Sequence, residues 1–169
     1  TFLDRLPREL SPEKTEGRDG FIHPYSVNGG VAEVTIHLIL RDFETEKLAE
    51  QQALLRSLSE TLGQENPSVT IDVSVIPQYR NMAAGLSNEP RAVAYAQMAH
   101  ERLGRVAQLT TVRGGTDGSQ LTEKGLPTPN LSSGQHNPHS PLEWACLDEM
   151  VQAGEVLQEL AQVWQESSA

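Results

Sequence analysis

An alternating apolar segment that follows an Asn-Gly-Gly sequence places the strongest constraint on the fold. In residues 34–40 every second side chain is a large apolar one, as expected for a strand with one buried face. The preceding Asn28-Gly29-Gly30 favours a tight turn, because asparagine and glycine tolerate positive φ angles. Residues 20–27 and 31–40 are therefore predicted to form an antiparallel hairpin.

The rest of the chain alternates between helical and extended patterns. Leucines at helical spacing predict a helix that is capped by Asp42 and stopped by Gly63. Further helices are predicted at about 89–103, capped by Ser87 or Asn88, then at 117–124 and at about 146–165. A buried stripe is expected on the last one, formed by Leu147, Met150, Val151, Leu157, Leu160, Val163 and Trp164. Strands are predicted at 69–75, 106–112 and 129–131. The order strand, strand, helix, strand suggests an α+β arrangement, an antiparallel sheet with helices on one face.

Charge, apolar runs and cysteine content limit the partners and the location expected for the protein. The 169 residues carry a formal net charge of −10, which argues against binding to nucleic acid or to an anionic membrane. No apolar run approaches the roughly 20 residues of a membrane span, and no signal peptide is expected. Cys146 is the only cysteine, so no internal disulfide forms and a cytoplasmic location is expected.

Two arginines stand at the ends of predicted strands. Arg41 ends the hairpin, and Arg113 ends the apolar run 106–112 and precedes two glycines that allow close approach of a ligand. A guanidinium group in such a place can bind a carboxylate with two parallel hydrogen bonds. The alternative for each is an ordinary surface salt bridge, which contributes little to stability.

A loop at residues 132–141 carries His136 and His139 among small and turn-forming residues. Neutral imidazole is a good zinc ligand, and a loop that leads into a helix can hold one in place. The alternative is a solvated histidine, which we prefer for His136. Glu143 follows the loop, either as a carboxylate favoured by the dipole of the last helix or as a residue that orients His139.

These residues belong to a series of motifs that resembles a known family. The run RGGTDGSQLTEKGLPTPNL at 113–131 is followed by G-x-x-N-x-H-x-x-x-E at 134–143. Upstream motifs in the same order are Ser11-Pro12-Glu13 with Thr15-Glu16-Gly17, Gly20-Phe21 with His23, Arg41-Asp42-Phe43, and Tyr79 with Asn81-Met82. The series is similar to the C-terminal part of peptidase T, the zinc-dependent tripeptide aminopeptidases of the dinuclear zinc exopeptidases.

The resemblance implies roles for four residues. Arg41 and Arg113 match arginines that hold the C-terminal carboxylate of the tripeptide, and Asn81 matches an asparagine that binds the substrate backbone. His139 matches a ligand of one of two zinc ions. Ser140 and Pro141, which follow His139, depart from the family pattern. The catalytic glutamate and the other zinc ligands of the family lie upstream of the matched part, so no catalytic residue is assigned in this chain.

The resemblance also implies an organisation for the chain. Residues 1–19 are expected to be a connector, 20–104 a lid domain with an antiparallel sheet, and 105–169 the C-terminal segment of an α/β zinc-exopeptidase catalytic domain. On this interpretation the chain is a fragment that is inactive by itself. The alternative is a non-catalytic module of the lid fold that forms homo-oligomers through an exposed strand edge. A ferredoxin-like RNA binder is disfavoured by the charge and by the lack of aromatic stacking residues.

Overall fold

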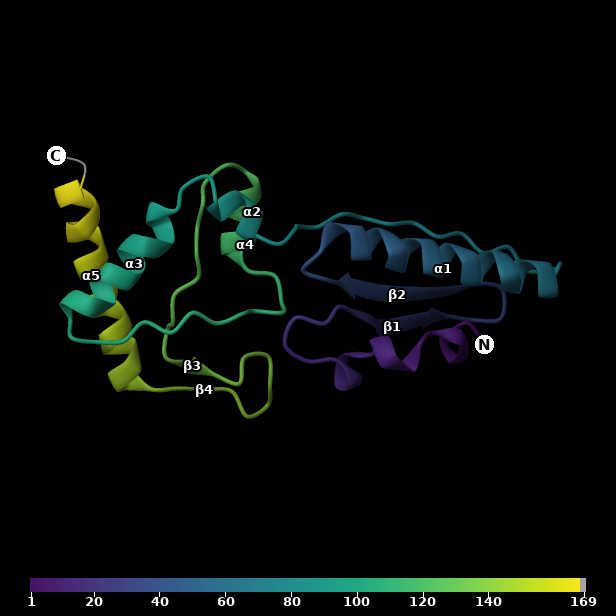
Figure 1. The fold of residues 1–169 in the computed structure, drawn as a ribbon. Helices are drawn as coiled ribbons and strands as arrows, with labels where there is room; N and C mark the ends of the chain where they lie inside the picture. The colour runs from purple at the N-terminus through teal and green to yellow at the C-terminus, as the bar shows by residue number, and fades with distance from the viewer. Residues whose placement is uncertain (168–169) are drawn as a thin grey trace. The chain divides into compact units, whose positions relative to one another are not determined.

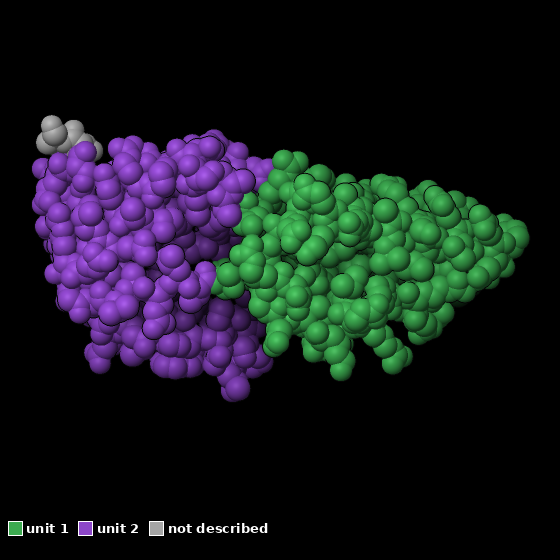
Figure 2. All heavy atoms as spheres, in the orientation of Figure 1, with its two compact units in different colours: residues 1–81, 111–115 green, residues 82–110, 116–169 purple. Residues whose placement is uncertain are grey.

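The computed structural model describes residues 1–167, which form two compact units (Figure 2). Unit 1 contains Thr1–Asn81 and Thr111–Gly115, and unit 2 contains Met82–Thr110 and the residues from Thr116 onward. In chain order the elements are η1 Leu3–Arg5, η2 Arg8–Leu10, η3 Pro12–Lys14, β1 Phe21–Gly29, β2 Val34–Arg41, α1 Thr45–Glu65, α2 Ala83–Leu86, α3 Arg91–Arg102, α4 Asp117–Glu123, β3 Gln135–His136, β4 Trp144–Ala145 and α5 Leu147–Ser167 (Figure 1). None of the helices in the described part of the chain is long and apolar enough to cross a membrane.

The predicted hairpin is present in unit 1 as the antiparallel pair β1 and β2. Its turn lies later than predicted, because Gly29 still pairs with Val34 and residues 30–33 make the connection. A β-carbon at Gly29 would lie 2.3 Å from the carbonyl oxygen of Glu33, so the chain closes here only with glycine. The expected antiparallel sheet with helices is thus confirmed in its simplest form, a two-stranded sheet.

Helix α1 lies along this hairpin beside β2 (Figure 1). Of the leucines at helical spacing, Leu55 is buried. It forms the small core of unit 1 with Ile22 of β1. The buried Gln51 donates its amide to the carbonyl of Arg41 at 3.2 Å and ties α1 to the end of β2. The predicted ends of the helix are wrong by two or three residues: Glu44 is the N-cap, and the helix continues past Gly63 to Glu65.

The strand predicted at 69–75 is wrong. This segment is extended and runs beside α1, and in the described residues it has no strand assignment (Figure 1). One contact with the helix is the Arg56 side chain, which donates to the carbonyl of Val73 at 3.3 Å. A helix satisfies its own backbone groups and offers no ladder to a neighbouring strand. The alternating apolar pattern is therefore present without a partner to pair with.

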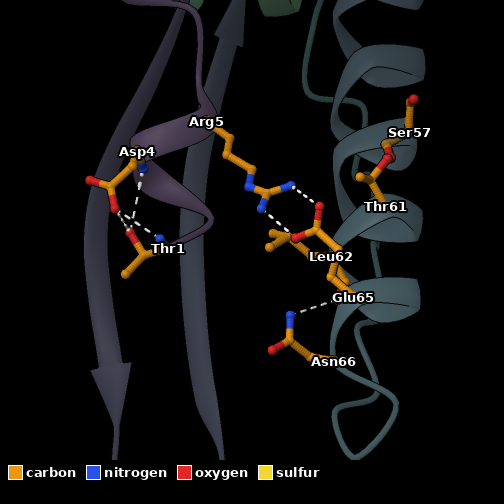
Figure 3. A network of polar contacts seen from close by, with 8 residues as sticks. All are labelled: Thr1, Asp4, Arg5, Ser57, Thr61, Leu62, Glu65 and Asn66. Carbon is orange, nitrogen blue, oxygen red and sulfur yellow. Dashed lines mark hydrogen bonds and ion pairs between the residues drawn. The ribbon is translucent and has the colours of Figure 1, made fainter.

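The N-terminal residues form three short 3-10 turns, and one of them is fastened to the end of α1. Arg5 makes two parallel hydrogen bonds with the carboxylate of Glu65, one of them at 3.0 Å (Figure 3). Beside it the amino terminus of Thr1 donates to Asp4 at 2.8 Å. Both ends of the Arg5–Glu65 pair are exposed, so it orients the segment more than it stabilises the fold.

Unit 2 is built on the packing of α3 against α5. Alanines at i, i+4 and i+7 on α3, Ala92, Ala96 and Ala99, are buried, and α5 buries Val156 and Val163. Small side chains allow the two helices to approach closely. Tyr95 meets Trp164 edge to face with ring centroids 4.7 Å apart, and Arg102 bridges two glutamates of α5.

Several expectations for unit 2 need correction. The strands predicted at 106–112 and 129–131 are unpaired extended chain in the described structure. Helix α3 begins after Pro90, and neither Ser87 nor Asn88 caps it. The stripe predicted for α5 is only partly right, because Val163 is buried whereas four of its members are exposed, Leu147, Met150, Val151 and Leu157. The short helix α4 is confirmed, with Thr116 as its N-cap.

Candidate functional site

The first group of predicted site residues gathers at the end of the hairpin where β2 stops. Arg41 is the last residue of β2 and pairs with Phe21, the first residue of β1. Residues that face each other across an antiparallel pair point to the same side of the sheet. The Arg41 guanidinium lies 4.9 Å from the centre of the Tyr79 ring, and it donates to the side-chain oxygen of Gln78 at 3.1 Å.

Arg113 reaches the same end of the hairpin from a distant part of the chain. Its guanidinium lies 5.0 Å from the centre of the Phe21 ring. It donates to the carbonyl of Thr15 at 2.7 Å, to the hydroxyl of Thr15 at 2.7 Å and to the carbonyl of Asp19 at 3.0 Å. The surface salt bridge considered above is therefore not its principal contact. Arg113 binds main-chain oxygens and fastens residues 15–19.

Tyr79 and Asn81 complete this group. A β-carbon at Gly115, two residues after Arg113, would lie 2.1 Å from the Tyr79 ring, so the glycine makes room for the hydroxyl end of that ring. The side-chain amide of Asn81 donates to the carbonyl of Phe43 at 3.2 Å, just beyond Arg41. The three predicted substrate-binding residues are thus brought together within unit 1.

The arrangement suits a ligand that carries a carboxylate. Two guanidinium groups lie at one end of a small sheet, each stacked on an aromatic ring that limits its movement. The buried Nε of Arg113 and the buried hydroxyl of Tyr79 have no hydrogen-bond partner among the described residues. Both atoms are exceptions to the usual pairing of buried polar groups.

His139 belongs to unit 2, in the connection between β3 and β4. This two-residue ladder pairs His136 with Trp144 and was missed from the sequence, where residues 132–141 read as loop. His139 is exposed and has a left-handed backbone, with φ 65°. Its N–H donates to the carboxylate of Glu143 at 2.8 Å.

Glu143 holds the connection rather than the start of α5. Its other carboxylate oxygen accepts from the side-chain amide of Gln135 at 2.8 Å. The Gln135 amide, and after it the N–H of His139, lower the pKa of the Glu143 carboxyl below its usual value. Of the two roles considered for Glu143, the contacts favour the one that acts on His139.

Zinc requires several donors close together, and the described residues do not supply them. Residues 1–167 contain no group of three or more His, Cys, Asp or Glu side chains that could hold a metal ion. His139 is a single exposed imidazole, and one imidazole does not make a zinc site. The described residues do not fit a zinc site by themselves.

The chain was compared with known proteins by family profile, by structure and by sequence. No protein-family profile matches the chain. Its fold is that of part of an aminopeptidase: the crystal structure of PepT from Bacillus cereus matches 96% of this chain and 43% of that chain, with a TM-score of 0.67 and 22% identity.

In sequence the chain is a relative of peptidase T. It is 36% identical to peptidase T of Geobacillus kaustophilus over 168 residues and 35% identical to that of Listeria monocytogenes serotype 4a over 165 residues. The matches cover 99% and 98% of this chain but 41% and 40% of those proteins. The resemblance expected from the motifs is thus confirmed along nearly the whole chain, which spans about 40% of the length of the curated relatives it matches.

Sequence reasoning missed the side chains that orient the site. Phe21 and Tyr79 were noted only as members of motifs, yet their rings stack on the two arginines. An aromatic residue beside a strand end that carries an arginine is the signal that could have suggested this. Gln135 and Trp144, which contact the His139 connection, carry no such signal in the sequence.

Proposed function

We propose that this chain is the C-terminal portion of a peptidase T-like metallopeptidase that releases the N-terminal residue from tripeptides. Its similarity to peptidase T along nearly the whole chain supports this proposal. The observation that carries it is the gathering of Arg41, Asn81 and Arg113 at one end of the β1–β2 hairpin. Residues 20–104 would serve as the lid domain after a connector at 1–19, and residues 105–169 as the end of the catalytic domain.

In this proposal the two arginines bind the C-terminal carboxylate of the substrate. The stacked guanidinium groups would select a free carboxylate at a fixed distance from the scissile bond, and Asn81 would bind the peptide backbone. His139 would contribute one ligand to a pair of zinc ions. The remaining ligands and the catalytic base have no counterpart in this chain, so the chain by itself is proposed to be inactive. A cytoplasmic location, supported by the single cysteine, is part of the same proposal.

Carboxylate recognition can be tested on the purified chain without any metal. We expect a free tripeptide to shift the NMR signals of the Arg41 and Arg113 side chains, and its C-terminal amide to bind at least about tenfold more weakly, because charged hydrogen bonds are lost. Arg41→Ala should abolish the difference between the two peptides. Arg56→Ala, which removes an exposed arginine on α1, is the matched control and should preserve it.

We call Arg41, Asn81 and Arg113 the clamp. A hydrolysis assay tests the catalytic centre separately from the clamp. With added zinc, neither a free tripeptide nor one with a blocked amino terminus should be cleaved by this chain. Cleavage of the free peptide alone would mean that the chain holds a complete centre. Equal binding of the tripeptide and its amide would count against the clamp.

The second candidate function is assembly of two copies through the hairpin. Several apolar side chains at its turn end are more than half exposed, Tyr25, Val27, Val31 and Val34. An uncovered strand edge with such residues invites pairing with another strand. If this is the function, Val27→Lys should lower the mass measured by light scattering, and Arg41→Ala should leave it unchanged. A monomeric mass for the unaltered chain would exclude this alternative.

A further inference from the structure

The connection between β3 and β4 has an unusual backbone. In the described residues 1–167, Asn137 and His139 are the two non-glycine residues with positive φ, at 49° and 65°. For a residue with a β-carbon this left-handed conformation costs on the order of 1 kcal/mol and persists only where neighbouring groups enforce it. The contacts around the connection show which groups those are.

The first group is the exposed carboxylate of Glu143, which binds two residues of the ladder and its connection. One oxygen accepts from the main-chain N–H of His139 and the other from the side chain of Gln135, both at 2.8 Å. The side chain of Ser140 accepts from the N–H of Leu142 at 3.1 Å and tightens the same turn. Glu143 therefore binds directly to the backbone of the histidine.

The second group fixes the base of the connection to helix α5. The His136 ring stacks on the Trp144 ring, with centroids 4.1 Å apart and planes inclined by 10°. The Nε2 atom of His136 lies 2.6 Å from the Oε2 atom of Glu149, a residue in the first turn of α5. We call His136, Trp144 and Glu149 the clasp. It joins both strands of the ladder to the helix.

We propose that Glu143 and the clasp are positioning residues that hold His139 in its left-handed conformation, so that the direction in which its side chain leaves the backbone is set before any ligand binds. This inference rests on the proposed function only for the role of His139 as a ligand. The positioning follows from two independent sets of contacts, one on the His139 backbone and one at the base of the connection. It also gives His136 a role, which the resemblance does not.

The test is backbone NMR of the metal-free 169-residue chain. In the unaltered chain the His139 amide proton should be shifted downfield and protected from exchange with solvent, because it donates to a charged carboxylate. Glu143→Ala should speed its exchange on the order of tenfold. Glu143→Gln keeps an acceptor oxygen and should give a rate between the two. Amides of α3 should be unchanged, which separates this effect from general unfolding.

The clasp is tested with a matched pair of variants on α5. Glu149→Gln should broaden or shift the His139 and Trp144 signals, whereas Glu155→Gln, which removes a partner of Arg105 on the same helix, should leave them unchanged. Unchanged His139 exchange in Glu143→Ala would overturn the inference. Loss of order at His139 in the control Glu155→Gln would also overturn it.

Zinc added to the same samples distinguishes this inference from the proposed function. If the exchange rate of the His139 amide changes in Glu143→Ala but its ring signals do not shift on addition of zinc, the positioning stands and the ligand role fails. If zinc shifts the ring signals equally in the unaltered chain and in Glu143→Ala, and amide exchange is equal too, the ligand role stands and the positioning fails.

Discussion

Replacing Gly134 by alanine is expected to destabilise unit 2 by about 2–4 kcal/mol. Gly134 is buried and has φ 76°, a conformation that L-residues rarely adopt. A β-carbon there would lie 2.8 Å from the nitrogen of Met150 and 3.0 Å from the oxygen of Cys146. These two atoms form a hydrogen bond of 3.0 Å at the start of α5, where the backbone cannot move aside without breaking it. Gly134 also accepts a hydrogen bond from the N–H of Cys146 at 2.9 Å, so the strain would reach the join between the ladder and the helix.

Urea unfolding followed by tryptophan fluorescence measures the stability of unit 2. Both tryptophans of the chain, Trp144 and Trp164, belong to unit 2. Gly154→Ala is the matched control: it makes the same change inside α5, where a β-carbon meets nothing within 4 Å, and should stabilise by about 0.5–1 kcal/mol. A Gly134→Ala chain as stable as the unaltered one would show that α5 does not lie against this glycine.

Replacing Arg113 by alanine is expected to destabilise unit 1 by about 2–3 kcal/mol. The guanidinium makes three hydrogen bonds to Thr15 and Asp19 and covers the ring of Phe21. Without it, the carbonyls of residues 15 and 19 lose these donors and the segment beside β1 loosens. Arg113→Lys keeps the charge but cannot reach both residues with a planar fork, so it should recover less than half of the loss.

Hydrogen exchange of the β1 and β2 amides is the measurement, since unit 1 contains no tryptophan. Protection should fall in Arg113→Ala and stay within about twofold of the unaltered chain in Arg56→Ala, an exposed arginine of the same unit. The same samples bear on the clamp. A variant that loses carboxylate binding while β1 and β2 keep their protection would show that Arg113 acts on the ligand and not on the fold.

The elements that could be predicted are those whose pattern and partner lie close together in the sequence. The hairpin of 20–40 and the helices near 45–65, 91–102 and 147–167 follow from periodicity and local turn signals. The strands expected at 69–75 and 106–112 have the right periodicity, but a strand also needs a neighbour, and the sequence does not say whether one exists. Whether such a segment becomes a strand depends on its pairing with a distant segment of the chain.

The same limit applies to the candidate site. The motifs locate Arg41, Asn81, Arg113 and His139, but they do not reveal what each side chain contacts. Arg113 binds Thr15, a residue 98 positions away, and no local pattern indicates that contact. Helix α5 shows a related limit, because it carries apolar residues on two faces and the sequence does not say which face is covered. Burial is decided by the partner helix α3.

The return of residues 111–115 to unit 1 has a consequence for how the chain folds as it is synthesised. Unit 1 is interrupted by residues 82–110, so its last segment leaves the ribosome well after the hairpin and α1. At the usual rates of translation, Arg113 is synthesised on the order of ten seconds after Thr15. A hairpin and α1 that form as they emerge would do so with residues 15–19 unfastened until then. Final closure of unit 1 is a late event that joins the two ends of a long loop.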